Sequence, residues 1–312
     1  MTAEIIDGRR IAATVREEVR LGAGRLLRET GTVPGLAVVM VGNAPASDVY
    51  VRTKEKAARS VGIETRTLRL GADATEARII EMVEGLNEDD SVHGVLVQLP
   101  LPPHVNSLAV SSAVNPLKDV DGLHPDNVGL LLIGSPRFVP CTPAGIQRML
   151  VESEAPTDGK HVVICGRSMI VGRPLAALLM QKRTEANATV TVAHTGTTDL
   201  PDLTRQADIL VAAIDKPRGI RADMVKPGAV VIDVGIHRLD DPSSEKGYRL
   251  VGDVDAEAVR HRAGMISPVP GGVGPMTVAM LLVNTLKAAT HAADTSKPTR
   301  HTAWAGCAPS RA

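Results

Sequence analysis

Residues 161–180 read HVVICGRSMIVGRPLAALLM and carry the clearest signal of the chain's architecture. The apolar run His161–Cys165 is typical of a buried strand, Gly166 begins a turn, and a helix starts near Gly172. Pro174 suits the first turn of that helix, because an N–H at this place has no intrahelical partner. A strand, a glycine turn and a helix in this order place phosphate at the helix N-terminus, so we predict a dinucleotide-binding unit.

The glycine turn is a weak signal when it stands alone. The usual G-x-G-x-x-G pattern is absent, so this motif leaves a structural loop and a dinucleotide site equally open. The next predicted strand, Thr189–His194, ends without the acidic residue that binds the ribose 2′-hydroxyl of NAD. Arg167 and Thr195 stand near that place and suit the 2′-phosphate of NADP. We therefore predict NADP, with a solvated loop residue as the alternative for Arg167.

Short β-branched runs alternate with stretches of helical period along most of the chain, which is typical of an α/β protein. A helix is expected at Gly8–Thr30 and another at Met276–Ala289. Besides the two strands named above, strands are expected at Leu36–Val41, Glu64–Leu70, Gly94–Gln98, Ile209–Ile214, Val230–Val234 and Met265–Pro268.

The proline, glycine and charges of Glu152–Gly159 mark a domain boundary. We predict two α/β domains with a cleft between them: residues 1–150 with 276–290, and residues 151–275 as a Rossmann-like, doubly wound parallel sheet. Residues 291–312 have no apolar period from Asp294 onward and are expected to form a disordered tail.

Composition excludes several classes of function. The 312 residues hold 35 Lys and Arg against 35 Asp and Glu, so no net charge favours nucleic acid or an anionic membrane. One Trp, two Tyr and one Phe leave no stacking platform for single-stranded nucleic acid. The N-terminus mixes charges, which does not resemble a secretory signal, and no segment is expected to reach membrane-spanning length.

The cysteine and histidine residues argue against a disulfide scaffold, a metal site and a protein nucleophile. Cys141, Cys165 and Cys307 form no C-x-x-C pair, which fits a reducing cytoplasm. The nine histidines show no H-x-x-x-H spacing and the chain has no G-x-S-x-G, so no metal is predicted. His194 and His237 are interpreted as loop or cofactor-facing residues.

Four polar or aromatic residues are expected to meet at one edge of the first domain. Residues 47–54, SDVYVRTK, begin a helix that places Tyr50 and Lys54 on one face. Gln98 ends a predicted strand, and Asp121 lies in the loop KDVDG. An aromatic face, an amine, an amide and a carboxylate suit a flat, nitrogen-rich heterocycle. For Tyr50 and Lys54, a surface aromatic beside a surface charge is the alternative.

Eight motifs occur in an order that resembles the methylenetetrahydrofolate dehydrogenase/cyclohydrolase family, from about residue 3 to residue 290. They are SDVYVRTK (47–54), VQLPLP (97–102), KDVDG (118–122), PCTP (140–143), GRSMIVGRP (166–174), VIDVGI (231–236), GDVD (252–255) and PVPGGVGPMT (268–277). The resemblance implies NADP-dependent oxidation of methylenetetrahydrofolate to the methenyl form, then hydrolysis to formyltetrahydrofolate. It also implies a cytoplasmic homodimer that acts in one-carbon metabolism and purine biosynthesis.

The resemblance also assigns residues. It implies that Tyr50 stacks on the folate, that Lys54 serves cyclohydrolase chemistry, that Gln98 orients Lys54 and that Asp121 binds the pterin. Further substrate contacts would come from Leu99, Gly271, Gly272, Val273, Gly274 and Pro275. The NADP contacts would come from Gly166, Arg167, Ser168, Thr195 and Ile236.

Two positions depart from the family pattern. Asp215 and Arg218 stand where the family usually has glycine. Asp215 is expected at the carboxyl end of a strand of the cofactor domain, where its carboxylate would repel a cofactor phosphate or accept a hydrogen bond from a ribose hydroxyl.

Other classes remain as alternatives. A non-catalytic or monofunctional folate- or nucleotide-binding relative is one, and a malate- or amino-acid-type dehydrogenase is a weaker one. Short-chain dehydrogenases share Y-x-x-x-K, but there the glycine turn comes first in the chain.

Overall fold

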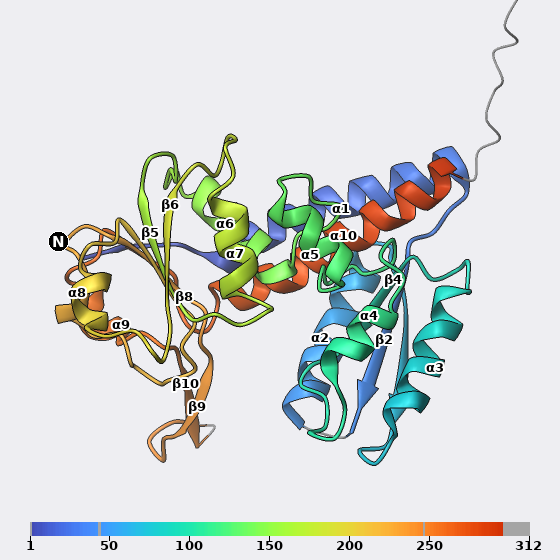
Figure 1. Cartoon of the computed structure of the whole chain (residues 1–312), viewed down its shortest axis with the longest axis horizontal. Coiled ribbons are helices and arrows are strands. Elements are labelled where there is room, and N and C mark those ends of the chain that lie inside the picture. Colours follow the sequence, from blue (N-terminus) through green and yellow to red (C-terminus); the bar gives the residue numbers. More distant parts are fainter. Residues whose placement is uncertain (1, 43–44, 246, 296–312) are drawn as a thin grey trace, which may run out of the picture.

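The computed structural model describes residues 2–42, 45–245 and 247–295. Two parallel sheets lie at opposite ends of the molecule, and two long helices run side by side between them (Figure 1). The predicted α/β class is thereby confirmed. An antiparallel hairpin of β9 (His237–Asp240) and β10 (Tyr248–Val251), which the sequence did not predict, projects from the larger unit.

The smaller sheet has three strands, and every pairing is parallel. In spatial order they are β3 (Glu64–Leu70), β2 (Gly35–Val41) and β4 (Gly94–Val97). Its crossover helices are α2 (Pro45–Ser60) and α3 (Glu76–Asn87), followed along the chain by α4 (Ser107–Ala113) and α5 (Pro125–Leu132). Successive residues of β2 point to opposite faces, so Val38 packs with Val51 of α2 whereas Val39 packs with Ile79 of α3.

The larger sheet has six parallel strands. In spatial order they are β1 (Glu4–Ile5), β11 (Met265–Ile266), β8 (Val230–Asp233), β7 (Ile209–Ala212), β5 (His161–Cys165) and β6 (Thr189–Ala193). The chain goes outward from β5 to β6, then crosses back to β7 and continues to β8. This reversal is the predicted doubly wound order, and it places a ligand-binding edge at the carboxyl ends of β5 and β7.

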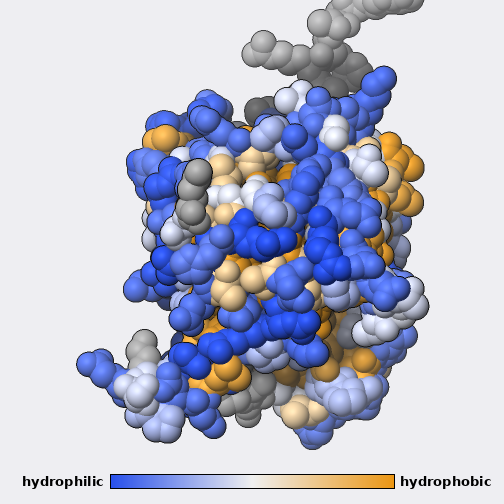
Figure 2. Space-filling model, turned by 90° about the vertical axis from the view of Figure 1, so that its left-hand side faces the viewer, coloured by the Kyte–Doolittle hydropathy of each residue, from blue (hydrophilic) through white to orange (hydrophobic). Residues whose placement is uncertain are grey.

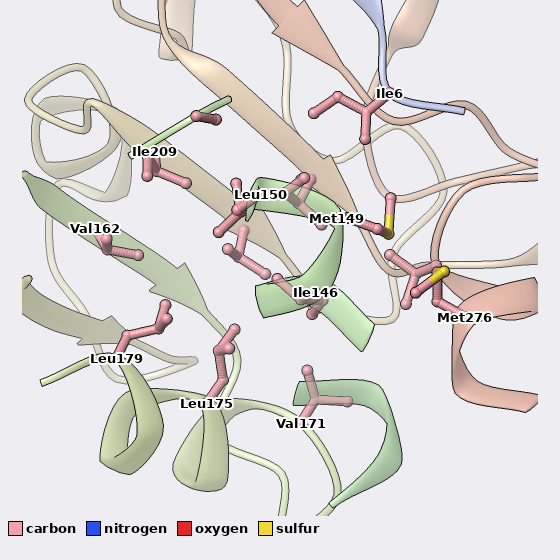
Figure 3. Packing of buried hydrophobic residues seen from close by; sticks show 14 of the residues in the cluster. Ile6, Ile146, Met149, Leu150, Val162, Val171, Leu175, Leu179, Ile209 and Met276 are labelled. Atoms are coloured by element: carbon pink, nitrogen blue, oxygen red, sulfur yellow. The ribbon is translucent and has the colours of Figure 1, made fainter. Parts of the chain in front are cut away.

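Helices cover both faces of the larger sheet. They are α6 (Cys141–Glu152), α7 (Gly172–Leu179), α8 (Leu200–Thr204), the 3-10 helix η1 (Ala222–Met224) and α9 (Ala256–Val259). Ile146 of α6 and Leu175 of α7 converge on Val162 of β5 and Ile209 of β7 (Figure 3). The end of this unit that carries α8 and α9 is mainly hydrophilic, with small apolar patches (Figure 2).

Two 23-residue helices, α1 (Gly8–Thr30) and α10 (Val273–Thr295), belong to the cores of both sheets. Val15 of α1 packs in a core of the larger sheet, whereas Val19, one turn later, packs in a core of the smaller one. A Cβ at Gly22 of α1 would lie 2.5 Å from the Cδ2 of Leu286, so the helices approach closely. Asp7 caps α1 by accepting hydrogen bonds from two backbone N–H groups.

The structure corrects three details of the sequence prediction. Several predicted strands end one or two residues earlier, so Gln98 follows β4 directly. Residues 4–5, predicted with the first domain, pair with β11 in the larger sheet. Helix α10 continues to Thr295, so residues 291–295 are helical and not part of a disordered tail. The remainder of the predicted tail lies outside the described residues, and the domain boundaries stay a prediction.

Helix α10 also corrects the expectation about membrane-spanning length. By length and composition alone it is long and apolar enough to cross a bilayer. Over half of its most apolar window, 56%, is nevertheless buried inside the protein. Met276 packs in a core of the larger sheet and Leu282 in a core of the smaller one. The apolar composition of α10 therefore fits its place as a helix shared by two cores.

We expect Gly172→Ala to destabilise the protein by about 1–3 kcal/mol through overpacking. A Cβ at Gly172 would lie 2.0 Å from the backbone oxygen of Gly166, which has little freedom to move. The matched control is Gly85→Ala in α3, where a Cβ meets nothing within 4 Å. It should stabilise by up to about 1 kcal/mol through helix propensity. Urea denaturation measures both values, and equal stabilities of the two variants would refute the close approach.

Candidate active site

A buried lysine marks the carboxyl edge of the smaller sheet. Lys54 of α2 is only 9% exposed, and its Nζ donates a hydrogen bond of 2.9 Å to the Oε1 of Gln98. The Nε2 of Gln98 donates in turn to the backbone oxygen of Leu99 at 2.7 Å. Because a lysine only donates, the amide oxygen must face it, and the amide is held in one orientation. The structure thus pairs Gln98 with Lys54, and the role of Gln98 in orienting Lys54 stays a prediction.

Asp121 lies at the same edge, in the loop that follows a parallel bridge between Val95 and Asp119. Burial raises the pKa of the Asp121 carboxyl, and the positive charge of Lys54 opposes that rise. Burial, with the negative charge of Asp121, also raises the pKa of the Cys141 thiol well above its usual value. The structure therefore brings an amine, an amide and a carboxyl group together.

Tyr50 lies one turn before Lys54 on α2 and is 39% exposed. Its ring is accessible to a ligand, as stacking requires, but no described contact ties it to Lys54. Sequence reasoning missed Asp119, which shapes this loop: its carboxylate accepts hydrogen bonds from the backbone N–H of His124 and from the Nδ2 of Asn127. The two acidic residues of KDVDG were the available signal for Asp119, but sequence reasoning assigned a role only to Asp121.

The predicted cofactor residues lie along the carboxyl edge of the larger sheet. Gly166 has φ +125°, and a Cβ there would lie 2.1 Å from the backbone oxygen of Ala213 after β7. Only glycine accommodates both the backbone angle and this contact. Arg167 and Ser168 are exposed beside it, and Thr195 is exposed beyond the end of β6. A cation and hydroxyl groups, with no acid at the end of β6, form a donor set that fits a 2′-phosphate.

Two other predicted contacts lie near this edge or beside α10. Ile236, in the loop after β8, is 49% exposed. Gly271 and Gly272 directly precede α10, and the backbone oxygen of Gly272 would lie 1.9 Å from a Cβ at Gly8, the first residue of α1. Val273, Gly274 and Pro275 form the first turn of α10. No hydrogen bond within the described ranges joins residues 271–275 to Lys54, Gln98 or Asp121, so their substrate contacts stay a prediction.

The backbone at the two departures from the family pattern explains why glycine is usual at these positions. Asp215 has φ +55° and Arg218 has φ +53°, in the left-handed region that favours glycine. The Asp215 side chain is fully exposed, and its Oδ1 lies 4.0 Å from the Nδ1 of His237. Repulsion of a cofactor phosphate by Asp215 stays a prediction.

Sequence reasoning assigned no role to two buried aspartates near this edge. Asp233, at the end of β8, is 2% exposed, and Asp253, after β10, is fully buried. Asp253 accepts hydrogen bonds from backbone N–H groups of the loop after β7 and from the Nε2 of His237 at 2.8 Å. For Asp233, the available signal was an acid that follows three apolar residues of a predicted strand. His237 thus faces a carboxylate, and among the described residues no group of three or more His, Cys, Asp or Glu side chains could hold a metal ion.

A separate hollow of about 700 Å³ lies at the opposite edge of the larger sheet, before β5 and β6. Pro156, Lys182 and Asn187 are among its lining residues, and none of the predicted site residues lines it. The cleft predicted between the domains stays a prediction.

Family models match most of the chain. The model of the tetrahydrofolate dehydrogenase/cyclohydrolase catalytic domain matches residues 6–121, and that of the NAD(P)-binding domain of the same enzymes matches residues 140–293. The chain belongs to this family. The resemblance stated from the eight motifs is thereby confirmed.

Relatives and solved structures agree with the family models. The chain is 54% identical to the bifunctional protein FolD 1 of Myxococcus xanthus over 92% of this chain and 98% of that protein. It is 51% identical to the bifunctional protein FolD of Chlorobium phaeobacteroides over 91% and 96%. The FolD structure from Trypanosoma brucei, complexed with NADP and an inhibitor, superimposes with a TM-score of 0.88 and 42% identity over 93% of this chain and 98% of that one.

We expect Asp233→Asn to change how stability depends on pH. Burial raises the pKa of Asp233 to about 7, against the opposing effect of its backbone hydrogen bonds. A carboxyl whose pKa is raised by folding stabilises the protein at low pH, and this contribution is lost as pH rises through about 7. Relative to the variant, the wild type should therefore lose roughly 2–3 kcal/mol of unfolding free energy between pH 5 and pH 8. Urea denaturation across this range tests the difference, and parallel pH profiles would contradict it.

Proposed function

We infer that this chain oxidises methylenetetrahydrofolate to methenyltetrahydrofolate with NADP and then hydrolyses the product to formyltetrahydrofolate. The observation that carries this inference is the buried Lys54–Gln98 pair beside Asp121, in a chain that also has the glycine turn of a dinucleotide-binding domain. The family models and the bifunctional relatives confirm the predicted enzyme class and cofactor.

We propose that the folate lies along the carboxyl edge of the smaller sheet. The exposed Tyr50 ring stacks on the flat pterin, and Asp121 binds its nitrogen-bearing edge. Burial raises the pKa of Asp121, so this carboxylate accepts a proton from a ligand more readily than an exposed one does. Leu99 and residues 271–275 complete the substrate contacts in this proposal.

Hydrolysis requires proton transfer, which we assign to Lys54. The oxygen of a water molecule bonds to the carbon of the methenyl cation and releases one proton. The resulting hydroxyl gives up its second proton as the C=O bond forms and one carbon–nitrogen bond breaks. The freed nitrogen gains one of the two protons, and the other goes to solvent. Lys54 Nζ exchanges these protons as acid and base, while Gln98 keeps it directed to one place by its 2.9 Å hydrogen bond. Lys54 is thus proposed as the catalytic residue, and Gln98 as a positioning residue.

The acceptor for the hydride of the methylene carbon would be supplied by bound NADP. The chain's own part in this reaction is to hold the two rings against each other, since hydride transfer requires no protein nucleophile. We propose that the Arg167 guanidinium binds the 2′-phosphate, with Ser168 and Thr195 as hydroxyl partners. Gly166 lets the backbone approach the cofactor, and the exposed Ile236 offers an apolar contact.

A non-catalytic relative would keep the fold without the reactive group. The Lys54–Gln98 bond counts against that alternative, because burying an amine is costly and a binding protein gains nothing from its proton transfer. We further propose a homodimer in the cytoplasm that supplies one-carbon units for purine biosynthesis. Its support is the family resemblance, together with the buried free thiols of Cys141 and Cys165, which fit a reducing compartment.

We expect Lys54→Met to abolish cyclohydrolase activity while folate binding stays within a few-fold of wild type, because a thioether packs in the same space but exchanges no proton. The control is Lys56→Met, which changes an exposed lysine of the same helix and should keep both activities. Conversion of methenyltetrahydrofolate, followed by absorbance, measures the effect. Unchanged conversion in Lys54→Met would refute the assignment.

For the cofactor, we expect the wild type to prefer NADP over NAD and Arg167→Ala to lose most of that preference. Removing a charge-assisted hydrogen bond should cost about 1.5–3 kcal/mol of NADP binding and little NAD binding. Arg25→Ala, an exposed arginine on α1, is the control and should not change the preference. KM values for both cofactors test this prediction. A wild type that uses NAD as well as NADP would contradict it.

A further inference from the structure

The loop after β7 is held by a single buried carboxylate. Asp253 accepts hydrogen bonds from three successive backbone N–H groups: those of Ile214 at 2.7 Å, Asp215 at 3.2 Å and Lys216 at 2.9 Å. These residues follow the end of β7 and belong to neither a helix nor a strand. Asp253 therefore satisfies backbone donors that the sheet leaves unpaired.

This loop lies where a doubly wound sheet binds its ligand. Residue Ala213, directly before it, contacts the Gly166 turn, since a Cβ on Gly166 would lie 2.1 Å from the Ala213 oxygen. The carboxyl ends of β5 and β7 flank the reversal of strand order. A shift of the loop after β7 would consequently disturb the surface that faces a dinucleotide.

The loop has a backbone conformation that requires support. Asp215 has φ +55°, which costs free energy for a residue other than glycine. Such a conformation persists when contacts with the surrounding structure hold it in place. The hydrogen bonds from three N–H groups to one carboxylate provide such contacts.

Asp253 is itself held from two sides. Asp233 accepts hydrogen bonds from the backbone N–H of Asp253 at 2.9 Å and of Val254 at 3.0 Å. On the other side, His237 donates from Nε2 to Asp253 Oδ1 at 2.8 Å. A Cβ at Gly235 would lie 2.4 Å from Asp253 Cγ, so the backbone of Gly235 packs directly against this carboxylate.

We propose that Asp253 is a positioning residue for NADP binding, which holds the Ile214–Lys216 loop in its binding conformation with His237 as its orienting donor. The proposal rests on the proposed function for the identity of the ligand. In this proposal the dehydrogenase reaction depends on Asp253, whereas the hydrolysis of methenyltetrahydrofolate does not.

The test is Asp253→Asn. An asparagine has nearly the same shape but only one acceptor oxygen, so its NH2 group would face backbone donors. In the NADP-free protein we expect amide hydrogen exchange of Ile214–Lys216 to accelerate at least tenfold. The Kd for NADP, measured by titration, should rise about tenfold, while kcat/KM of the cyclohydrolase reaction stays within twofold. Asp255→Asn is the matched control, because Asp255 makes no side-chain capping bond to α9 and should change none of these values.

A second pair of variants keeps the proposal testable if Asp253→Asn fails to fold. His237→Ala removes the orienting donor and should raise the Kd for NADP about threefold, and His237→Gln should restore part of the loss by donating in its place. Unchanged loop exchange and NADP affinity in Asp253→Asn would overturn the proposal. So would an equal loss of cyclohydrolase activity, or a His237→Ala protein that binds NADP normally. A wild type without dehydrogenase activity, whose loop exchange still responds to Asp253→Asn, would instead refute the proposed function.

Discussion

The packing of α1 against α10 links the two halves of the molecule (Figure 1). Each helix contributes its apolar residues first to a core of the larger sheet and then to a core of the smaller one. One face of each sheet therefore packs on the helix pair, whereas the core on the opposite face of each sheet contains no residue of these helices. A helix is stiff over this length, and the close approach at Gly22 prevents the pair from separating without loss of packing. The distance between the two carboxyl edges is therefore set by a shared core rather than by a linker.

Each edge contains a buried polar group that is held by hydrogen bonds to its neighbours. At the smaller sheet it is Lys54, whose hydrogen-bond acceptor, Gln98, itself donates to a backbone oxygen. At the larger sheet it is Asp253, which three backbone N–H groups and His237 surround. Burying a charged or strongly polar group is costly, so each of these groups lies where a neighbouring group forms a hydrogen bond with it. These hydrogen bonds also limit the movement of the buried groups, which is what orientation of a substrate and a cofactor requires.

Most strands and the long helices could be predicted because their signals are local. The period of apolar residues identified Gly8–Thr30 as a helix, with the same bounds as α1, and His161–Cys165 as a strand, with the same bounds as β5. The hairpin of β9 and β10 could not be predicted, since each strand has only four residues, too few for their mixture of polar and apolar side chains to show a period. Helix α10 was predicted too short because its last turn is held by packing against α1 rather than by its own periodicity.

The sequence by itself determined the family, the α/β class and the residue types of both sites, because motifs and periodicity are properties of neighbouring residues. It also placed Tyr50 and Lys54 on one helix face, since they are four positions apart. Only the folded chain showed that Lys54 is bonded to Gln98 and that Asp253 holds the loop after β7. These partners are 44 and 39 residues apart in the chain. Their meeting depends on the order of strands in each sheet and on packing against shared helices, which no local pattern encodes.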